Sequence, residues 1–536
     1  MNSLIKSPLF WMAASGLLIL MLFAVDLLLV NETTLTPFVE HHQCLPMKTD
    51  ARGVQYLTDM ETGEFYTVKR GKLFLYNPAD GSTKDPQRMF RSYQADEHGI
   101  VVTYKPISPL YAFYKPALSY KVYFITFLTG LYIYTAFLLK SRLRSSPIKS
   151  LLFLAISAVV IRGSFAWLRH GFSQMGGEFL VYANEEFIFD AANIQNLAEF
   201  IRSYPVLMPS LSLHGSHFPP GNAVLFKLIA MIAGHTTIEE ISSQIWIYGW
   251  LIVCLGSTVV IPIYLITKKM ANAESAFMAA ALFILLPNSI SFGAVSMDAL
   301  FAVTAVWSVY FYVSALTDHS ARYSLITGML LGIASFFSFS AFPLGLFILM
   351  MSLLSVIRSK DQFHRQLRIC LVIGAGFLGT VILAYLLGYN MYATLGVAMK
   401  QNHKLMEEVV NRYYGRELGE LWAINSLGNM LSFLIASGVP LAGLWLKTIF
   451  ALSGNNRDRF SMRDMAIVLA LFVIVLACSN LHFRETERIW LYISALIPVA
   501  VAQLLNDSQH DKVAMFVVLG CAFQSLASEV LLFTIW

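Results

Sequence analysis

Charge is what this sequence has least of. Only 13% of its 536 residues are Asp, Glu, Lys or Arg, whereas 57% are hydrophobic and the mean hydropathy is +0.61. Soluble proteins carry roughly twice that charged fraction, so the composition excludes a soluble globular protein and predicts a polytopic membrane protein. The net charge of +5 does not indicate nucleic-acid binding, because the basic residues gather in short loops between apolar segments.

Cysteine and the common nucleotide-binding motifs are also scarce or missing. Of the five cysteines, most fall in or at the ends of apolar segments and none has metal-ligand spacing, so we interpret them as small packing residues. The sequence contains no Walker motif, no Rossmann glycine fingerprint and, in its long loop, no DxD. These absences disfavour a nucleotide-sugar donor. We assign no metal-ligating residue and no certain cofactor, and a divalent metal ion is the one cofactor left open.

Apolar segments of membrane-spanning length recur along the whole chain. About 13 of them approach the length of about 20 residues that a membrane helix needs, which predicts an all-α polytopic membrane protein. The first segment lacks a small-residue cleavage site, so we expect an uncleaved anchor rather than a signal peptide. The predicted spans are 9–30, 121–139, 150–168, 245–267, 273–290, 298–316, 323–341, 343–357, 369–388, 426–448, 464–479, 489–505 and 513–534.

The distribution of lysine and arginine predicts the orientation. The basic short loops all fall on one side if the N-terminus is cytoplasmic, and that side is expected to be the cytoplasm. This requires that Asn222 to Gly234, roughly 20 Å long as a helix, lies on the outer leaflet instead of crossing roughly 30 Å of hydrocarbon, with Lys227 snorkelling. A short tilted span is the alternative. We expect a bacterial inner (plasma) membrane protein whose active site faces outward.

The same reading divides the chain into five parts. Segments EFYTVK and KLFLYN alternate around Arg70-Gly71 and predict a small β-rich extracytoplasmic insertion, for which we expect a structural or acceptor-docking role. A further outer segment, 392–422, is typical of an amphipathic helix at the membrane surface. The predicted parts are an anchor at 1–30, the β-rich domain at 31–120, a helix and cytoplasmic linker at 121–149, a membrane core at 150–388 with the outer loop 169–244, and a C-terminal membrane region at 389–536 with the outer loop 389–425.

The long outer loop and three later motifs carry a family resemblance. They are Asp190, SLSLHGSHFPPG from Ser210 to Gly221, SMDAL from Ser296 to Leu300, and FRETERIWL from Phe483 to Leu491. In this arrangement residues 150–536 resemble the GT-C superfamily of membrane glycosyltransferases, which includes protein mannosyltransferases, aminoarabinose transferases and actinobacterial arabinosyltransferases. HFPPG departs from the usual HPPG by an inserted aromatic residue. The resemblance implies transfer of a sugar from a polyprenyl-phosphate donor to an acceptor on the extracytoplasmic side, and about 11 spans after residue 150.

Asp190 is the predicted catalytic residue. A glycosyl transfer that inverts the anomeric carbon needs a carboxylate to take the proton of the acceptor, whereas a phosphate leaving group needs no strong acid. The alternative is that Asp190 caps a helix over 191–202, because aspartate is favoured at that position. Glu185 and Glu186 compete for the role of base.

Several residues are predicted to bind substrate. Arg484 and Arg488 would lie one helical turn apart at an outer helix mouth, where a planar guanidinium suits a lipid phosphate; the alternative is an interfacial anchor with an internal Glu-Arg pair. Asp298 either faces the site or caps the helix 298–316. His217 either bonds the substrate or is structural, and His214 is the weaker candidate of the two. The full set is His217, Lys227, Arg484, Glu487, Arg488, Asp298 and Glu186.

Two functions from other classes compete with the glycosyltransferase. A transporter or flippase of lipid-linked sugars would share the spans, but it should show internal repeats and broken helices with ionisable residues in the membrane, and no clear repeat is present. A glycan polymerase or ligase of related architecture would use similar outer arginines. The expected partners are a polyprenyl-phosphate-linked sugar, a glycan, lipid or protein acceptor, and the lipid bilayer, without nucleic acid.

Overall fold

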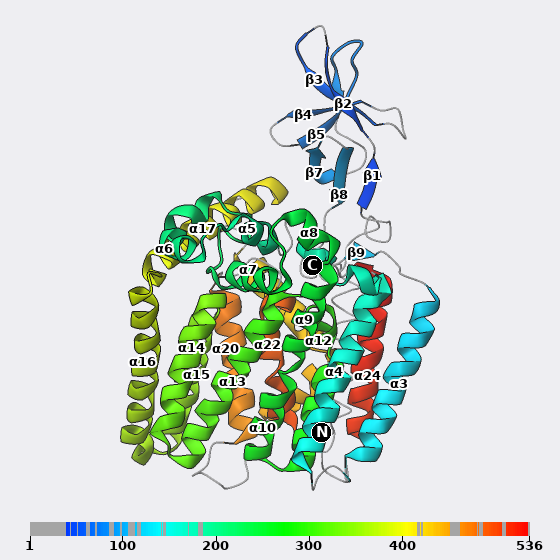
Figure 1. Ribbon diagram of the computed structural model, residues 1–536. Coiled ribbons are helices and arrows are strands. Elements are labelled where there is room, and N and C mark those ends of the chain that lie inside the picture. The colour runs from blue at the N-terminus through cyan, green and yellow to red at the C-terminus, as the bar shows by residue number, and fades with distance from the viewer. Residues whose placement is uncertain are drawn as a thin grey trace.

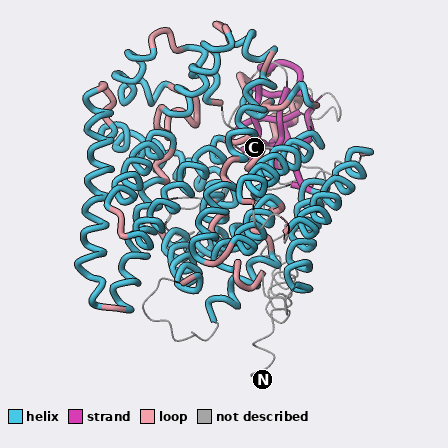
Figure 2. Tube along the Cα trace, turned by 60° about the horizontal axis from the view of Figure 1, so that its bottom comes forward, coloured by secondary structure: helices cyan, strands magenta, loops and turns pink. Residues whose placement is uncertain are grey.

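The computed structural model describes most of the chain after residue 38. The described residues are 39–42, 44–50, 52–59, 65–69, 72–84, 90–96, 99–104, 113–114, 119–140, 142, 146–169, 171–180, 186–414, 419, 422–450, 461–479, 481, 486–505 and 511–533. The predicted anchor 9–30 lies outside them. Helices dominate the described residues and form a bundle, and most of the strands gather in one lobe beyond one end of it (Figures 1 and 2).

Short antiparallel strands occupy the segment before the first described helix. β2 to β6 form one sheet in sequence order, and β7, β8 and β1 form another. β4 and β5 pair antiparallel with Lys69 opposite Lys72, as the alternating pattern on the two sides of Arg70-Gly71 predicts. That this segment is a separate extracytoplasmic domain remains a prediction. The strands are β1 (Val39–His42), β2 (Cys44–Thr49), β3 (Gln55–Asp59), β4 (Phe65–Lys69), β5 (Lys72–Tyr76), β6 (Thr83–Lys84), β7 (Phe90–Asp96), β8 (Gly99–Tyr104), β9 (Phe113–Tyr114) and, at the other end of the chain, β10 (Leu532–Phe533).

The helices differ in length. The helices of 15 residues or more are α3 (Tyr120–Leu139), α4 (Pro147–Arg169), α13 (Met297–Asp318), α14 (Ala321–Phe337), α15 (Ala341–Arg358), α16 (Phe363–Leu386), α17 (Met391–Tyr414), α18 (Trp422–Ala436), α20 (Met462–Cys478) and α24 (Asp511–Leu531). Helices α9 (Ile245–Ser257) and α10 (Val260–Met270) follow each other as one candidate span of 26 residues. The shorter helices are η3 (Phe172–Gln174), η4 (Gly177–Leu180), α5 (Phe187–Asn193), α6 (Leu197–Leu207), η5 (Met208–Ser210), α7 (Gly221–Ala233), α8 (Ile238–Ser243), α11 (Ala273–Ile284), α12 (Pro287–Ser291), α19 (Val439–Phe450), η6 (Lys360–Gln362), α21 (Thr486–Ile489), α22 (Leu491–Ser494) and α23 (Ile497–Val501).

The chain is an integral membrane protein with several spans, but the predicted count of about 13 is not supported. Among the described residues, 7 helices are long and apolar enough to cross a membrane, or up to 8 if a pair bent by 107° is one span. The bent pair is α18–α19, within the predicted span 426–448. Predicted spans 273–290 and 489–505 are divided into shorter helices: Pro287 begins α12, and Pro498 is the second residue of α23. The helices α14 and α20, in the predicted spans 323–341 and 464–479, have 17 residues each. Because the predicted span 9–30 lies outside the described residues, the larger count stays a prediction.

Close backbone contacts hold the long helices together. A Cβ added at Gly328 of α14 would lie 2.0 Å from the carbonyl oxygen of Ile373 in α16, and one at Gly376 of α16 would lie 2.5 Å from that of Leu325. Two glycines facing each other allow the helices to approach closely, as small residues do in membrane bundles. Either glycine replaced by a larger residue would push α14 and α16 apart.

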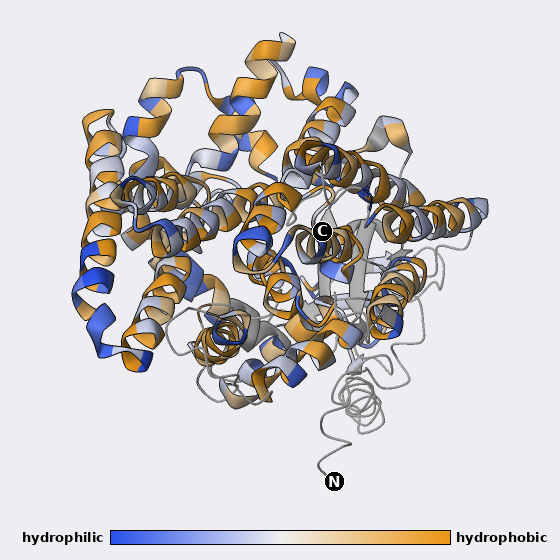
Figure 3. Cartoon of the chain, turned by 90° about the horizontal axis from the view of Figure 1, so that it is seen from below, coloured by the Kyte–Doolittle hydropathy of each residue, from blue (hydrophilic) through white to orange (hydrophobic). Residues whose placement is uncertain are grey.

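The two ends of the bundle differ in composition. α10 and α15 end at one end of the bundle, where Lys268, Lys269 and Arg358 occupy their last turns. Viewed from this end, hydrophilic residues lie at the helix tips (Figure 3). The opposite end carries α5, α6, α7, α8 and α17 (Figure 1). The basic loops and the long loop 169–244 therefore lie at opposite ends, as the predicted topology requires.

Helix α7 is the apolar stretch that the topology had to place outside the membrane. It runs from Gly221 to Ala233, ends at Gly234 with φ 75°, and lies across the end of the bundle (Figure 1). Asn222 and Phe226 face the protein, while Met231 and Ile232 are exposed. A helix lying across the bundle does not act as a span, so the structure agrees with the orientation chosen for it.

Candidate functional site

A pocket lies where the long loop covers the end of the bundle. It is a small cleft between α5, the loop before α7, the start of α13, the end of α14 and α21. Its apolar wall consists of Phe187, Phe218, Met297, Phe301 and Phe337. Its polar groups are His214, Asn222, Asp298, Ser338 and Arg488. An apolar pocket with a few converging polar groups is the usual form of a small-molecule site.

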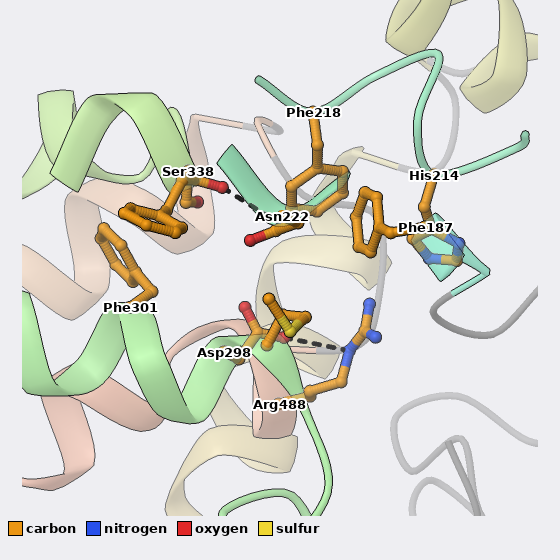
Figure 4. A pocket seen from close by; sticks show the side chains of 10 residues that line it. Phe187, His214, Phe218, Asn222, Asp298, Phe301, Ser338 and Arg488 are labelled. Atoms are coloured by element: carbon orange, nitrogen blue, oxygen red, sulfur yellow. Dashed lines mark hydrogen bonds and ion pairs between the residues drawn. The ribbon is translucent and has the colours of Figure 1, made fainter. Parts of the chain in front are cut away.

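Asp298 and Arg488 form an ion pair in this pocket. Nε of Arg488 lies 3.4 Å from Oδ2 of Asp298, and the side chains are only 5% and 9% exposed (Figure 4). Asp298 is the second residue of α13, where an acidic group is favoured by the helix dipole, and Ser296 caps that helix by accepting the Asp298 N–H at 3.1 Å. The alternative that Asp298 is the helix cap is therefore wrong. Removing water strengthens the attraction between the two charges, so each holds the other in position.

Two carboxylates one turn apart on α5 approach the pocket from the other side. Glu186, at the start of α5, is 1% exposed, and its Oε2 lies 3.3 Å from Nδ1 of His214. Because an ionised carboxylate can only accept a hydrogen bond, this contact favours the His214 tautomer with the proton on Nδ1 and a free lone pair on Nε2. The other oxygen, Glu186 Oε1, is buried and has no hydrogen-bond partner among the described residues. The His214 ring lines the pocket and packs between Phe187 and Phe218.

Asp190 lies behind this pair. Its carboxylate accepts the backbone N–H of Ser212 at 2.9 Å and the Ser212 hydroxyl at 2.6 Å, and the side chain is 6% exposed. Burial raises the pKa of Asp190, the Ser212 hydrogen bonds lower it, and nearby Glu186 raises it. The net direction is upward, so the protonated form is favoured more than in an exposed aspartate.

Hydrogen bonds from Tyr204 hold the loop 210–220 in place. The Tyr204 hydroxyl lies 3.0 Å from the carbonyl oxygen of Gly215 and 2.8 Å from that of Phe218. A Cβ at Gly215 would lie 2.2 Å from Oδ2 of Asp190, so only glycine allows the loop to approach this carboxylate. These contacts place His214 and Phe218 at the pocket.

His217, in the same loop, is turned to the loop itself. Its Nδ1 contacts the Leu213 carbonyl oxygen and lies 3.0 Å from the Ser216 hydroxyl. Burial lowers the pKa of His217, although the contact with Leu213 raises it. The neutral ring is therefore favoured, and it acts here as a loop contact.

The structure brings some of the predicted site residues together and not others. Asp298 and Arg488 share the pocket, and Glu186 lies directly behind His214. Asp190 and His217 do not line it, Lys227 is half-buried on α7, and Glu487 is buried on α21. Arg484 and Glu185 lie outside the described residues.

The capping alternative for Asp190 is also wrong. Asp190 lies inside α5, which ends at Asn193, and the next helix is capped by Asn196, whose side chain accepts the N–H groups of Ala198 and Glu199. The sequence pattern joined α5 and α6 into one helix because nothing in their composition marks the break between them. The extended backbone at Ile194 makes that break.

Sequence reasoning missed three of the residues that matter here. His214 was ranked below His217, Asn222 was seen only as the start of α7, and Arg162 in α4 was not singled out. A signal for His214 did exist: it lies in the same Ser- and His-rich loop as His217. Nothing local could show that Asn222 would face Asp298. Among the described residues, no group of three or more His, Cys, Asp or Glu could hold a metal ion.

Comparison with known proteins finds one family model that is similar to part of the chain. The sequence model of the family described as dolichyl-phosphate-mannose-protein mannosyltransferase matches residues 218–397, roughly a third of the chain. The matched segment contains α7, Asp298 and the helices up to the start of α17. No curated protein matches the chain.

Several solved structures of one protein are also similar to the chain. A crystal structure of the Archaeoglobus fulgidus oligosaccharyltransferase with zinc and sulfate has 15% identity and a TM-score of 0.42, covering 70% of this chain and 53% of that one. The same enzyme tethered with an acceptor peptide has 12% identity and a TM-score of 0.43, covering 70% and 55%. The same archaeal enzyme with an inhibitory peptide and a dolichol-phosphate has 12% identity and a TM-score of 0.37, covering 70% and 56%. The chain thus spans about half the length of these relatives, and at such scores the likeness carries no argument about function.

The family match concerns the same part of the chain that carries the pocket's α7 and α13 residues. It agrees with the resemblance deduced from HFPPG and SMDAL. Over residues 218–397 the chain is similar to this mannosyltransferase family.

Proposed function

We propose that the protein transfers a sugar from a polyprenyl-phosphate donor to an acceptor on the extracytoplasmic side of the membrane. The observation that carries this proposal is the convergence of a buried arginine-aspartate pair and a glutamate-histidine pair on one pocket. The pocket lies at the end of the bundle opposite the basic loops, where the positive-inside rule places the outer surface.

Arg488 is the proposed ligand of the donor phosphate. A guanidinium can donate two parallel hydrogen bonds to phosphate oxygens, and it keeps its charge in a dry site. Its Nε faces Asp298, and Figure 4 shows the rest of the guanidinium directed toward the His214 side of the pocket. Asp298 would hold the arginine while the phosphate is absent and orient it when the donor binds.

The proposed base is the His214–Glu186 pair. The oxygen of the acceptor hydroxyl attacks the anomeric carbon, the bond from that carbon to the phosphate oxygen breaks, and the hydroxyl proton passes to Nε2 of His214. Glu186, at 3.3 Å from Nδ1, would stabilise the resulting imidazolium. The polyprenyl phosphate leaves without needing a proton, because phosphate is a good leaving group.

Asp190, the base expected from the sequence, is the alternative. It would need to free an oxygen from the two hydrogen bonds with Ser212 and reach past the loop 210–220. The geometry therefore favours Glu186 with His214 as the base and Asp190 as the residue that anchors the loop.

The decisive experiment is a transfer assay on the purified protein in lipid nanodiscs. Synthetic polyprenyl-phosphate sugars would be supplied together with an envelope extract as the source of acceptor. We expect release of free polyprenyl phosphate and a product that carries one added sugar. A product with many added sugars would instead favour the polymerase or ligase.

A transporter of lipid-linked sugars is the second candidate. Two features favour it: the α18–α19 pair is bent by 107°, and Arg162 is a fully buried charge within a membrane helix. In sealed proteoliposomes a transporter would move the intact donor between leaflets. Donor that crosses without cleavage would overturn the glycosyltransferase proposal.

A further inference from the structure

Helix α12, Pro287 to Ser291, connects three parts of the membrane bundle. It has only five residues and lies between α11 and α13. Each of its three polar side chains contacts a different helix: Ser289 contacts Arg162 of α4, Asn288 contacts Ser494 of α22, and Ser291 contacts Glu529 of α24. Such a short polar helix inside an apolar bundle needs these partners, because unpaired polar groups are costly there.

Arg162 makes the contact of these three that involves a buried positive charge. The side chain is fully buried, and NH2 donates to the Ser289 hydroxyl at 2.8 Å while NH1 lies 3.4 Å from that of Ser257. The guanidinium also lies 5.5 Å from the centre of the Phe283 ring. No carboxylate lies within ion-pair distance of Arg162 among the described residues. A buried charge balanced only by hydroxyls and a ring is expensive, so a role beyond packing is expected.

The segment that Arg162 holds leads directly to the pocket. From Ser289 the chain passes Gly293, where a Cβ would lie 2.2 Å from the Ser289 carbonyl oxygen and 3.1 Å from Cζ of Arg162. It then reaches Ser296, which caps α13, and Asp298, which pairs with Arg488. A side chain at position 293 would therefore crowd the Ser289 carbonyl and Arg162, so glycine is what allows this connection to pass close to the guanidinium.

We propose that Arg162 is a positioning residue for Asp298. Through Ser289 it fixes the connection from α12 to α13, and this connection sets where Asp298 meets Arg488. Arg162 does not touch the pocket itself. The inference rests on the proposed function in one respect, since it assumes that the Asp298–Arg488 pair takes part in transfer.

The first test uses Ser289→Ala, which removes one hydroxyl that Arg162 needs and leaves the arginine in place. Ser437→Ala is the matched control, because Ser437 is also a buried serine and contacts Ser494 at 2.8 Å, away from Arg162. We expect Ser289→Ala to lower kcat/KM for the donor by about tenfold, the effect of losing roughly one hydrogen bond to a charged group. Ser437→Ala should leave it within about twofold.

A double-mutant cycle separates positioning from loss of folded protein. If Ser289 acts through Asp298, Ser289→Ala should have almost no further effect on transfer in an Asp298→Asn background. A variant that merely destabilises the bundle would lower activity by the same factor in both backgrounds. Equal effects in the two backgrounds would overturn the inference.

A second readout needs no activity. The variant Asp298→Cys with Arg488→Cys, in a chain without other cysteines, should be linked by a short bifunctional thiol reagent. Adding Ser289→Ala should slow that link severalfold, whereas adding Ser437→Ala should not. Unchanged linking would refute the positioning role even if transfer is observed. Slower linking in a protein that transfers no sugar would uphold it and remove the proposed function instead.

Discussion

The two ends of the helix bundle hold their charges in different ways. At the basic end, Nζ of Lys269 pairs with Asp318 at 2.7 Å, with side chains that are 26% and 42% exposed. At the pocket end, Arg488 and Asp298 pair at 3.4 Å with side chains that are 5% and 9% exposed. The exposed pair has the shorter distance, yet water screens it.

This contrast separates charges that set topology from charges that serve a site. Lysines at the basic end need only remain on one side of the membrane, so exposure suits them. A charge pair removed from water costs free energy that the fold has to offset elsewhere, and such cost is typical of functional sites. The distance between the charged atoms alone would have singled out the exposed pair, whereas burial singles out the pair in the pocket.

The comparison depends on which end of the bundle faces the outside of the membrane, and cysteine labelling tests this. Single cysteines at His217 and Gln244, in a chain without other cysteines, should both react with an impermeant thiol reagent applied from outside, because α7 lies across the bundle end between them. Lys268→Cys at the basic end is the control and should react only after permeabilisation. Labelling at His217 alone would mean that α7 crosses the membrane and that the later loops are inverted.

The largest expected effect on turnover is at the base. Glu186→Gln and His214→Ala should each lower transfer by about a hundredfold or more, the usual contribution of a positioned acid-base group. Asp190→Asn keeps the shape of the side chain and part of its hydrogen bonding to Ser212, so it should lower transfer less. A near-normal rate in Glu186→Gln together with a hundredfold loss in Asp190→Asn would restore Asp190 as the base.

Donor binding should respond next most strongly, at Arg488. Arg488→Lys keeps the charge but loses the planar fork, so donor affinity should fall by about 1–3 kcal/mol, which corresponds to roughly 5- to 150-fold. Titration of the folded variant with a polyprenyl-phosphate sugar measures the change. An Arg488→Ala variant that is folded and binds donor normally would remove this residue from the site.

The pH dependence of stability tests the buried carboxylate behind the pocket. Burial raises the pKa of Asp190 above its value in the unfolded chain, so the stability it contributes is fully present below the unfolded pKa and is lost as pH rises through the folded pKa. Thermal unfolding of the purified protein should therefore show a component that weakens above about pH 4, and this component should vanish in Asp190→Asn. Ser212→Ala removes the hydroxyl hydrogen bond that lowers this pKa and keeps the backbone one, so it should shift the component to higher pH.

The smallest effect should come from the exposed pair. Lys269→Ala should change the free energy of unfolding by less than about 1 kcal/mol, because surface ion pairs contribute little. Asp298→Ala leaves Arg488 buried without its carboxylate and should cost about 3 kcal/mol or more. Chemical denaturation in the same detergent compares them directly, and similar losses would contradict the distinction between the two ends.

Particular residues show how far the sequence alone could lead. The motifs HFPPG and SMDAL pointed to the superfamily whose mannosyltransferase model matches residues 218–397, and the basic loops led to a placement of α7 that agrees with its position across the end of the bundle. The predicted spans 273–290 and 489–505 differ from the structure, because short helices that carry Pro287 and Pro498 divide these apolar segments. Arg488 and Asp298 were both proposed as site residues, but nothing indicated that they would touch.

The sequence by itself determined the membrane class, the order of apolar segments, the β4–β5 hairpin and the family resemblance, because each depends on residues that are close together in the chain. Only the tertiary structure decided that Asp298 pairs with Arg488 and that His214 instead of His217 lines the pocket. It also decided that Ser212 donates hydrogen bonds to the Asp190 carboxylate. These contacts depend on how helices and loops pack, and packing between distant segments leaves no local pattern. Arg162 was overlooked for the same reason. In the sequence it is one arginine in an apolar helix, and only the fold shows that it donates a hydrogen bond to Ser289.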